Sequence, residues 1–122
     1  GDSAKIVLEL PEDKSDFRYT EQVELYVYRM VQQACENALK HGKPRTLTVR
    51  GRLEVISINL VIEDDGIGFE MMDRRDLAKL QARNHFGLAG MYERASLIGA
   101  DLHIESVVGS GTCVKINWRL SG

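Results

Sequence analysis

Polar side chains with ligand-binding chemistry recur at helical spacing between residues 33 and 41. Gln33, Asn37 and His41 stand at i, i+4 and i+8, with Lys40 beside His41, so one face of a helix would carry the three spaced residues. Amide and cationic side chains at the end of an apolar helix stripe can bind a polar ligand. The spacing alone fits a polar ligand site and an ordinary solvated helix edge equally well.

Two more polar residues stand in phase with apolar side chains on separate predicted strands. Asp64 continues an even-numbered apolar series, and Thr112 begins another. Because side chains alternate between the faces of a strand, both should point inward. A buried carboxylate is costly unless donors reach it, and the amides of its own turn could serve Asp64. Two inward polar groups on separate strands nevertheless favour a shared buried site.

Glycines follow Asp64 and also precede a second predicted helix. Gly66 and Gly68 permit positive backbone torsions or the close approach of a ligand. Gly87 and Gly90 lie at the start of the later helix, where the first backbone amides are free to bind an anion.

The elements that would position these residues follow from the periodicity of the apolar side chains. A buried stripe that includes Tyr26 predicts a helix from a cap at Thr20 to about His41. A second helix carries the stripe Leu88, Met91, Ala95 and Ile98 and ends at Gly99. Alternating patterns predict strands at residues 5–10, 46–53 and 56–62, one beginning at 102 and one at 112–120, with turns at 53–55 and 109–111. The charged residues 70–86 predict a mobile flap, partly helical around 77–80.

Length and composition predict one compact domain, since 122 residues with 43% hydrophobic content suit a single core. The formal net charge of −2 argues against nucleic acid as a partner. Cys35 and Cys113 lack metal or redox spacing, so we expect free thiols in a reducing cytoplasm. No apolar run reaches membrane-spanning length and no signal peptide is visible, although the sequence opens without Met.

Four motifs in order resemble the Bergerat-type ATP-binding fold shared by gyrase, MutL and sensor histidine kinases. More narrowly, the chain is similar to the catalytic ATP-binding domain of a bacterial two-component sensor histidine kinase, in the short-lid subclass that partners helix-turn-helix response regulators. Residues 29–41 match its N box, 63–69 its first glycine box, 86–95 its second and 109–112 its closing motif.

The resemblance implies an α/β (α+β) fold: a two-layer sandwich with a mixed, mostly antiparallel sheet and helices on one face. Residues 1–122 would form a single catalytic domain with a flexible lid at about 70–86. ATP would bind between the helices and the lid.

It also implies roles for individual residues. Asp64 would accept a hydrogen bond from the exocyclic amine of adenine, and Thr112 would support it through water. Asn37 would coordinate Mg²⁺ through its amide oxygen and, with Gln33, occupy the catalytic positions. Lys40 and His41 would approach the phosphates. The wall and the phosphate cradle would come from Gly66, Gly68, Gly87, Leu88, Gly90 and Met91, with lid contacts from Arg83 or His85.

One position departs from the pattern. Four residues before Asn37, ATP-hydrolysing relatives and many kinases of this subclass carry Glu, whereas this chain carries Gln33. An amide does not take a proton from water at neutral pH, and Glu36 lies about one helical step away from that position. We therefore expect very slow hydrolysis of free ATP.

The full-length protein would transfer the γ-phosphoryl group to a histidine on a separate dimerisation domain and from there to a cognate response regulator. His41, His85 and His103 do not fit the acceptor context, so the isolated domain should bind ATP as a monomer without autophosphorylation. Any membrane association would come from domains outside this chain. The alternatives are an anti-sigma-type serine kinase and a non-catalytic nucleotide-binding interaction domain; Rossmann and P-loop proteins fit poorly.

Overall fold

A five-stranded sheet forms one layer of the molecule. The computed structural model describes residues 3–11, 19–69 and 86–121. The strand order is β1-β2-β3-β5-β4; β1 pairs with β2 in parallel, and the other neighbours pair antiparallel. The predicted mixed, mostly antiparallel sheet is confirmed. The strands are β1 (Lys5–Glu9), β2 (Thr46–Glu54), β3 (Ser57–Asp64), β4 (Asp101–Val107) and β5 (Gly111–Arg119).

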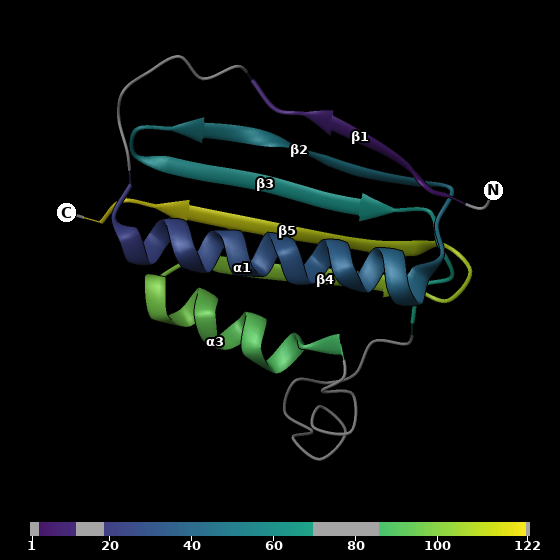
Figure 1. The fold of residues 1–122 in the computed structure, drawn as a ribbon. Helices are drawn as coiled ribbons and strands as arrows, with labels where there is room; N and C mark the ends of the chain where they lie inside the picture. Colours follow the sequence, from purple (N-terminus) through teal and green to yellow (C-terminus); the bar gives the residue numbers. More distant parts are fainter. Residues whose placement is uncertain (1–2, 12–18, 70–85, 122) are drawn as a thin grey trace.

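The helices α1 (Glu21–Asn37) and α3 (Leu88–Ile98) lie side by side on one face of this sheet, as predicted (Figure 1). The core lies between the two layers, and its fully buried side chains come from both: Met30, Leu47, Ile58, Met91 and Ile116. Residues at three-to-four spacing on the helices meet every second residue of the strands, which is how both layers bury one apolar face.

Capping interactions fix the helix ends where the sequence predicts them. Thr20 Oγ1 accepts a hydrogen bond from the Val23 amide at 3.3 Å at the start of α1. Gly99 ends α3 with a φ of 71°, and its amide donates to Ser96 O at 3.2 Å. Such caps satisfy backbone groups that have no partner within the helix.

The end of the first helix differs from the prediction. The chain stays helical to about His41, as predicted, but its last turn is of another type: α1 ends at Asn37 and a π-helix, η1 (Ala38–Gly42), follows. Lys43 then adopts a left-handed conformation with a φ of 47°. The π-helix turn widens the backbone, and Gly42 O accepts a hydrogen bond from Ile67 N at 2.8 Å. The irregular turn is therefore accompanied by a tertiary contact with the segment 65–69, called the glycine loop below.

The β2–β3 loop is displaced from the predicted position. Glu54 pairs with Ser57, so the turn contains Val55 and Ile56 rather than residues 53–55. Ile56 begins the even-numbered apolar series that Asp64 continues and was expected to face inward, yet it is 48% exposed because it lies in the turn. At the same end of the sheet, Leu120 lies beyond β5 and is also exposed; its amide donates to Ile56 O at 2.8 Å.

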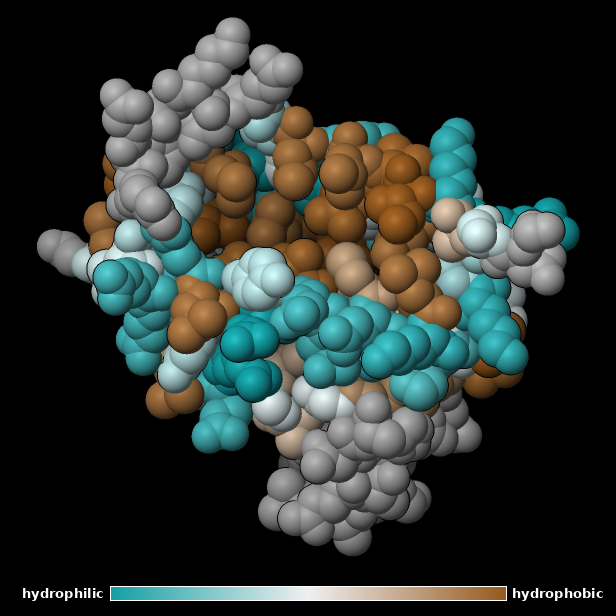
Figure 2. All heavy atoms as spheres, in the orientation of Figure 1, coloured by the Kyte–Doolittle hydropathy of each residue, from teal (hydrophilic) through white to brown (hydrophobic). Residues whose placement is uncertain are grey.

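The β1 edge leaves part of the sheet's helix-side face uncovered. Ile6 and Leu8 pair with the buried Leu47 and Val49 of β2, yet both are exposed. Figure 2 shows this apolar area above the polar outer surface of α1. Tyr26 of the predicted buried stripe is only half-buried. The predicted lid at 70–86, apart from Phe86, lies outside the described residues, as do Arg83 and His85.

Candidate nucleotide site

A cavity of about 230 Å³ lies between the two layers, where α1 and β3 end and α3 begins. Seven of the predicted site residues line it: Asn37, His41, Asp64, Gly68, Leu88, Met91 and Thr112. The remaining lining is mostly apolar: Ala34, Ala38, Gly42, Ile62, Ile67, Phe69, Phe86, Ile104 and Val114. An apolar cavity with few polar groups is the usual form of a small-molecule site.

Five predicted residues do not line this cavity. Gln33, Gly66, Gly87 and Gly90 lie outside its lining, and Lys40 is an exposed residue of η1. His85 falls outside the described residues. The strand phase that singled out Asp64 and Thr112 is confirmed, since both residues line the cavity from neighbouring strands.

Asp64 supplies the cavity's carboxylate from the last position of β3. Its Oδ1 accepts the Gly66 amide at 2.8 Å. Burial raises the pKa of Asp64 above its ordinary value, against the opposing effect of hydrogen bonds from the backbone of Gly66 and Thr112. A carboxylate has about four acceptor positions, so two backbone donors leave capacity for a donor on a ligand.

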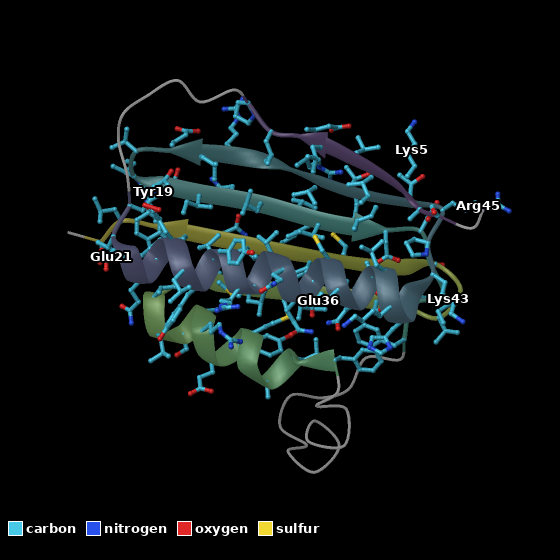
Figure 3. All side chains as sticks on the ribbon, in the orientation of Figure 1. Lys5, Tyr19, Glu21, Glu36, Lys43 and Arg45 are labelled. Carbon is cyan, nitrogen blue, oxygen red and sulfur yellow. The ribbon has the colours of Figure 1, made fainter. Side chains whose placement is uncertain are left out.

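The carboxylate of the next residue, Asp65, has a structural role. Asp65 is exposed, and its Oδ1 accepts the backbone amides of Arg45 and Thr46, each at 2.9 Å. These hydrogen bonds lower the pKa of Asp65. Figure 3 places Arg45 at the end of the sheet where η1 leads into β2. Asp64 therefore faces the cavity, while Asp65 fixes the adjoining chain.

The glycine loop is held against the β4–β5 hairpin by backbone contacts. Gly68 has a φ of 65°, and a Cβ there would lie 2.2 Å from Val107 O. The Gly109 amide donates to Ile67 O at 2.7 Å. Only glycine tolerates both the positive φ and the close contact at residue 68. Packing against the hairpin, as well as the approach of a ligand, therefore accounts for this glycine of the predicted box.

Asn37 stands at the end of α1 with both amide atoms engaged. Its Oδ1 accepts Gln33 Nε2 at 3.1 Å, and its Nδ2 donates to Phe86 O at 2.6 Å. The amide oxygen has two acceptor positions, so one remains. Mg²⁺ takes oxygen ligands and usually keeps waters and phosphate oxygens beside a few protein ligands. The residue thus fits a site in which the protein supplies a single oxygen.

Other potential metal ligands are sparse. Within residues 3–11, 19–69 and 86–121, no three His, Cys, Asp or Glu side chains gather as a cation site. A divalent ion at Asn37 would therefore take most of its ligands from a nucleotide and from water.

Gln33 packs directly beneath the start of α3. Gly87, the residue before α3, has a φ of 68°, and a Cβ there would lie 2.6 Å from Gln33 Cδ. The amide of Gln33 therefore serves two purposes: it supports the helix start and orients Asn37. Glu36, one residue before Asn37, does not line the cavity and lies on α1 (Figure 3).

Two phenylalanine rings beside the predicted residue His41 form a part of the site that was not predicted from sequence. Phe69 and Phe86 stack with ring centroids 4.9 Å apart, and Phe86 meets His41 edge-on at 5.0 Å. Both phenylalanines line the cavity. Each directly adjoins a glycine of the glycine boxes, a position that could have marked them as lining residues.

Residues 22–122 match the family of histidine kinase-, DNA gyrase B-, and HSP90-like ATPases. The chain belongs to this ATPase family. Its relatives include the signal transduction histidine-protein kinase/phosphatase DegS of Bacillus subtilis, 35% identical over 109 residues, which cover 89% of this chain and 27% of DegS. The sensor protein VraS of Staphylococcus saprophyticus is 30% identical over 117 residues, 96% of this chain and 32% of VraS. The predicted resemblance to sensor histidine kinases is confirmed, and the ATPase domain spans about a third or less of these two relatives.

Solved structures show the same ATPase-family fold. The histidine kinase domain of the Erythrobacter litoralis EL346 blue-light activated histidine kinase superposes with a TM-score of 0.66 at 21% identity, covering 96% of this chain and 52% of that one. The ATP binding domain of PrrB from Mycobacterium tuberculosis gives 0.65 at 17% identity, covering 100% and 83%. In the part of the chain that the structure describes, no helix is both long and apolar enough to cross a bilayer.

Proposed function

We propose that residues 1–122 form the catalytic domain of a two-component sensor histidine kinase and bind Mg-ATP in the cavity between α1, α3 and the sheet. The observation that carries the proposal is the placement of Asp64: a half-buried carboxylate lines a mostly apolar cavity that Asn37 also lines. The family match and the relatives named as kinases support the same function.

The base would enter between apolar walls and meet Asp64 at their end. The 6-amino group of adenine is a donor and pairs with a carboxylate, whereas guanine presents an acceptor oxygen at that position. Thr112 lies next to Asp64 and offers a hydroxyl to a bridging water. The cavity of about 230 Å³ is below the ~300–1,000 Å³ of sites for whole drug-sized ligands, so it suits the base rather than the entire nucleotide.

The triphosphate would extend from the cavity toward Asn37 and His41. Asn37 Oδ1 keeps one acceptor position for Mg²⁺, which, when bound, neutralises charge on the phosphate oxygens. The chain itself orients that oxygen through Gln33 and Phe86. Lys40 on η1, His85, and amides near Gly87, Leu88 and Gly90 are further proposed phosphate contacts.

Phosphoryl transfer requires a nucleophile from elsewhere in the full-length protein. An imidazole nitrogen of a separate dimerisation domain would attack the γ-phosphorus, the bond to the bridging oxygen would break, and ADP would leave. The response regulator would receive the group next. Within this chain, His103 is exposed on β4 and contacts Glu105 at 2.8 Å, so it does not face the cavity. We propose that the isolated domain is monomeric and cytoplasmic and does not autophosphorylate.

The amide of Gln33 should slow the hydrolysis of free ATP more than the transfer of the phosphoryl group to histidine. Its side chain donates to Asn37 instead of accepting a proton, so no base at this position activates water. Transfer to histidine would suffer less because that nucleophile can be activated on its own helix.

A nucleotide titration tests the proposed function. The 122-residue chain is titrated with Mg-ATP and with Mg-GTP in a calorimeter. We expect saturable binding of Mg-ATP and much weaker binding of Mg-GTP. Equal binding of the two nucleotides, or no binding of either, contradicts the proposal.

A further inference from the structure

Ser106 is the one buried polar side chain among the residues that the structure describes, at 7% exposure. It lies on β4 in phase with the buried Ile104. It does not line the cavity. A buried hydroxyl costs free energy unless it is hydrogen-bonded, so its partners indicate what it does.

The partners of Ser106 Oγ belong to two walls of the nucleotide cavity. The Phe69 amide donates to it at 2.8 Å, and Thr112 Oγ1 lies 2.7 Å away. Ser106 Oγ can also donate its proton to Gly111 O at 3.3 Å. A serine hydroxyl has one proton and two acceptor positions. One acceptor position takes the Phe69 amide, and in the short contact with Thr112 one of the two hydroxyls donates to the other.

The contact with Ser106 restricts the orientation of the Thr112 hydroxyl. When Ser106 donates its proton to Thr112, Thr112 Oγ1 accepts; when Ser106 donates to Gly111 O, Thr112 donates its own proton to Ser106. In both arrangements Ser106 sets which hydrogen-bonding role remains for Thr112 toward the cavity. Without Ser106 the threonine hydroxyl would rotate freely, and a water bridge to a ligand would lose its orientation.

The second partner connects Ser106 with the opposite end of the site. Phe69, whose amide Ser106 accepts, stacks on Phe86, and Phe86 O accepts the side-chain amide of Asn37. A continuous set of contacts therefore runs from Thr112 through Ser106 and the two phenylalanine rings to Asn37. Packed contacts of this kind can transmit a structural change from one end of the site to the other. Energetic coupling between the residues has to be measured to show that they do so.

We propose that Ser106 is a positioning residue for nucleotide binding, which acts through the hydroxyl of Thr112 and the backbone of Phe69. The inference rests on the proposed ATP function of the cavity. Ser106 would touch neither base nor phosphate; it orients the threonine hydroxyl that would reach the base through water, and it holds the backbone of Phe69 beside it.

A double-mutant cycle tests the inference. Mg-ATP affinity is measured for the 122-residue chain and for Ser106→Ala, Thr112→Val and the double variant. We expect each single substitution to weaken binding roughly three- to tenfold, as the loss of one net hydrogen bond does. The double variant should be only slightly weaker than Thr112→Val, because the serine then has no threonine hydroxyl to orient. Multiplicative losses overturn the inference.

Two controls separate positioning from folding. Ser96→Ala removes an exposed hydroxyl near the C-terminal end of α3, away from the cavity lining, and should leave affinity unchanged. Ser106→Cys fills the same space with a weak hydrogen-bonding group and should lose affinity while remaining folded by circular dichroism. A folded Ser106→Cys chain that binds Mg-ATP as tightly as the parent overturns the inference. If the parent chain itself does not bind Mg-ATP, the proposed function fails instead.

Discussion

Replacing Asp64 by asparagine changes one oxygen of the cavity and little else. The substituted side chain keeps an oxygen that can accept the Gly66 amide, which in the native chain donates to Asp64 Oδ1 at 2.8 Å. The other carboxylate oxygen becomes an NH₂ group. If that group faces the 6-amino group of adenine, two donors oppose each other, and the charge-assisted hydrogen bond is lost.

The expected loss of affinity follows from that single bond. A hydrogen bond to a charged group contributes about 1.5–3 kcal/mol, which corresponds to a roughly 10- to 150-fold weaker dissociation constant for Mg-ATP. Binding of Mg-GTP should not fall in parallel, because guanine presents an acceptor where adenine presents the amine. The ratio of the two affinities is thus a sharper measure than either value.

Stability should change in the opposite direction. Burial raises the pKa of Asp64, so the native state binds its proton more tightly than the unfolded state does. Linkage then makes the stability of the free domain fall as pH rises from the ordinary Asp range through the raised pKa. At neutral pH the ionised carboxylate destabilises the fold, and Asp64→Asn should leave the melting temperature unchanged or raise it.

Asp65→Asn is the matched control, since the carboxylate next in sequence accepts two backbone amides outside the cavity. Its pKa is lowered, so its stabilisation is present above the ordinary Asp pKa and is lost as pH falls through the lowered value. We expect Asp65→Asn to bind Mg-ATP normally and to melt earlier. Calorimetric titration and thermal unfolding at neutral pH measure both. Undiminished ATP affinity in Asp64→Asn, or equal affinity losses in the two variants, refutes this assignment of roles.

Gln33→Glu should raise the rate of phosphate release from Mg-ATP, because it restores a base beside Asn37; a parent domain that hydrolyses ATP equally fast contradicts that role for Gln33. Acidification should weaken Mg-ATP binding from a pH above the ordinary Asp range, because protonated Asp64 loses acceptor capacity, and titrations of Asp64→Asn should show a flatter profile. Lys43→Gly should stabilise the fold by up to about 1 kcal/mol in chemical denaturation, since the left-handed backbone at φ 47° disfavours lysine; a lower unfolding midpoint would speak against strain there. Removal of Mg²⁺ by EDTA should weaken ATP binding in the parent and much less in Asn37→Ala, and an equal loss in both would exclude Asn37 as the ligand.

The helices and strands were predictable from sequence. So were the polar residues whose direction follows from the alternation of side chains along a strand. Period-two alternation predicted that Asp64 and Thr112 face inward, and both line the cavity. The same rule would have found Ser106, which follows Leu102 and Ile104 at the same spacing. Its significance depends on a partner on another strand, and the phase of β4 alone does not identify that partner.

The irregular parts depended on tertiary contacts that no local pattern encodes. Helical periodicity continues to His41, yet the backbone widens into η1, where Gly42 meets the glycine loop. The register of β2 on β3 places Ile56 in a two-residue turn, although its apolar side chain continues the inner series. The Phe69–Phe86 stack joins residues on either side of a long intervening segment.

The central claim is that the cavity holds the adenine base, and nuclear Overhauser effects from a bound nucleotide test it most directly. With Mg-ADP bound to the 122-residue chain, the adenine H2 and H8 protons should show contacts to side chains of Met91, Ile104 and Val114, which line the cavity. The Asp64 and Thr112 amides should shift as well. Adenine contacts confined to residues outside the cavity, with these side chains unperturbed, would contradict the account.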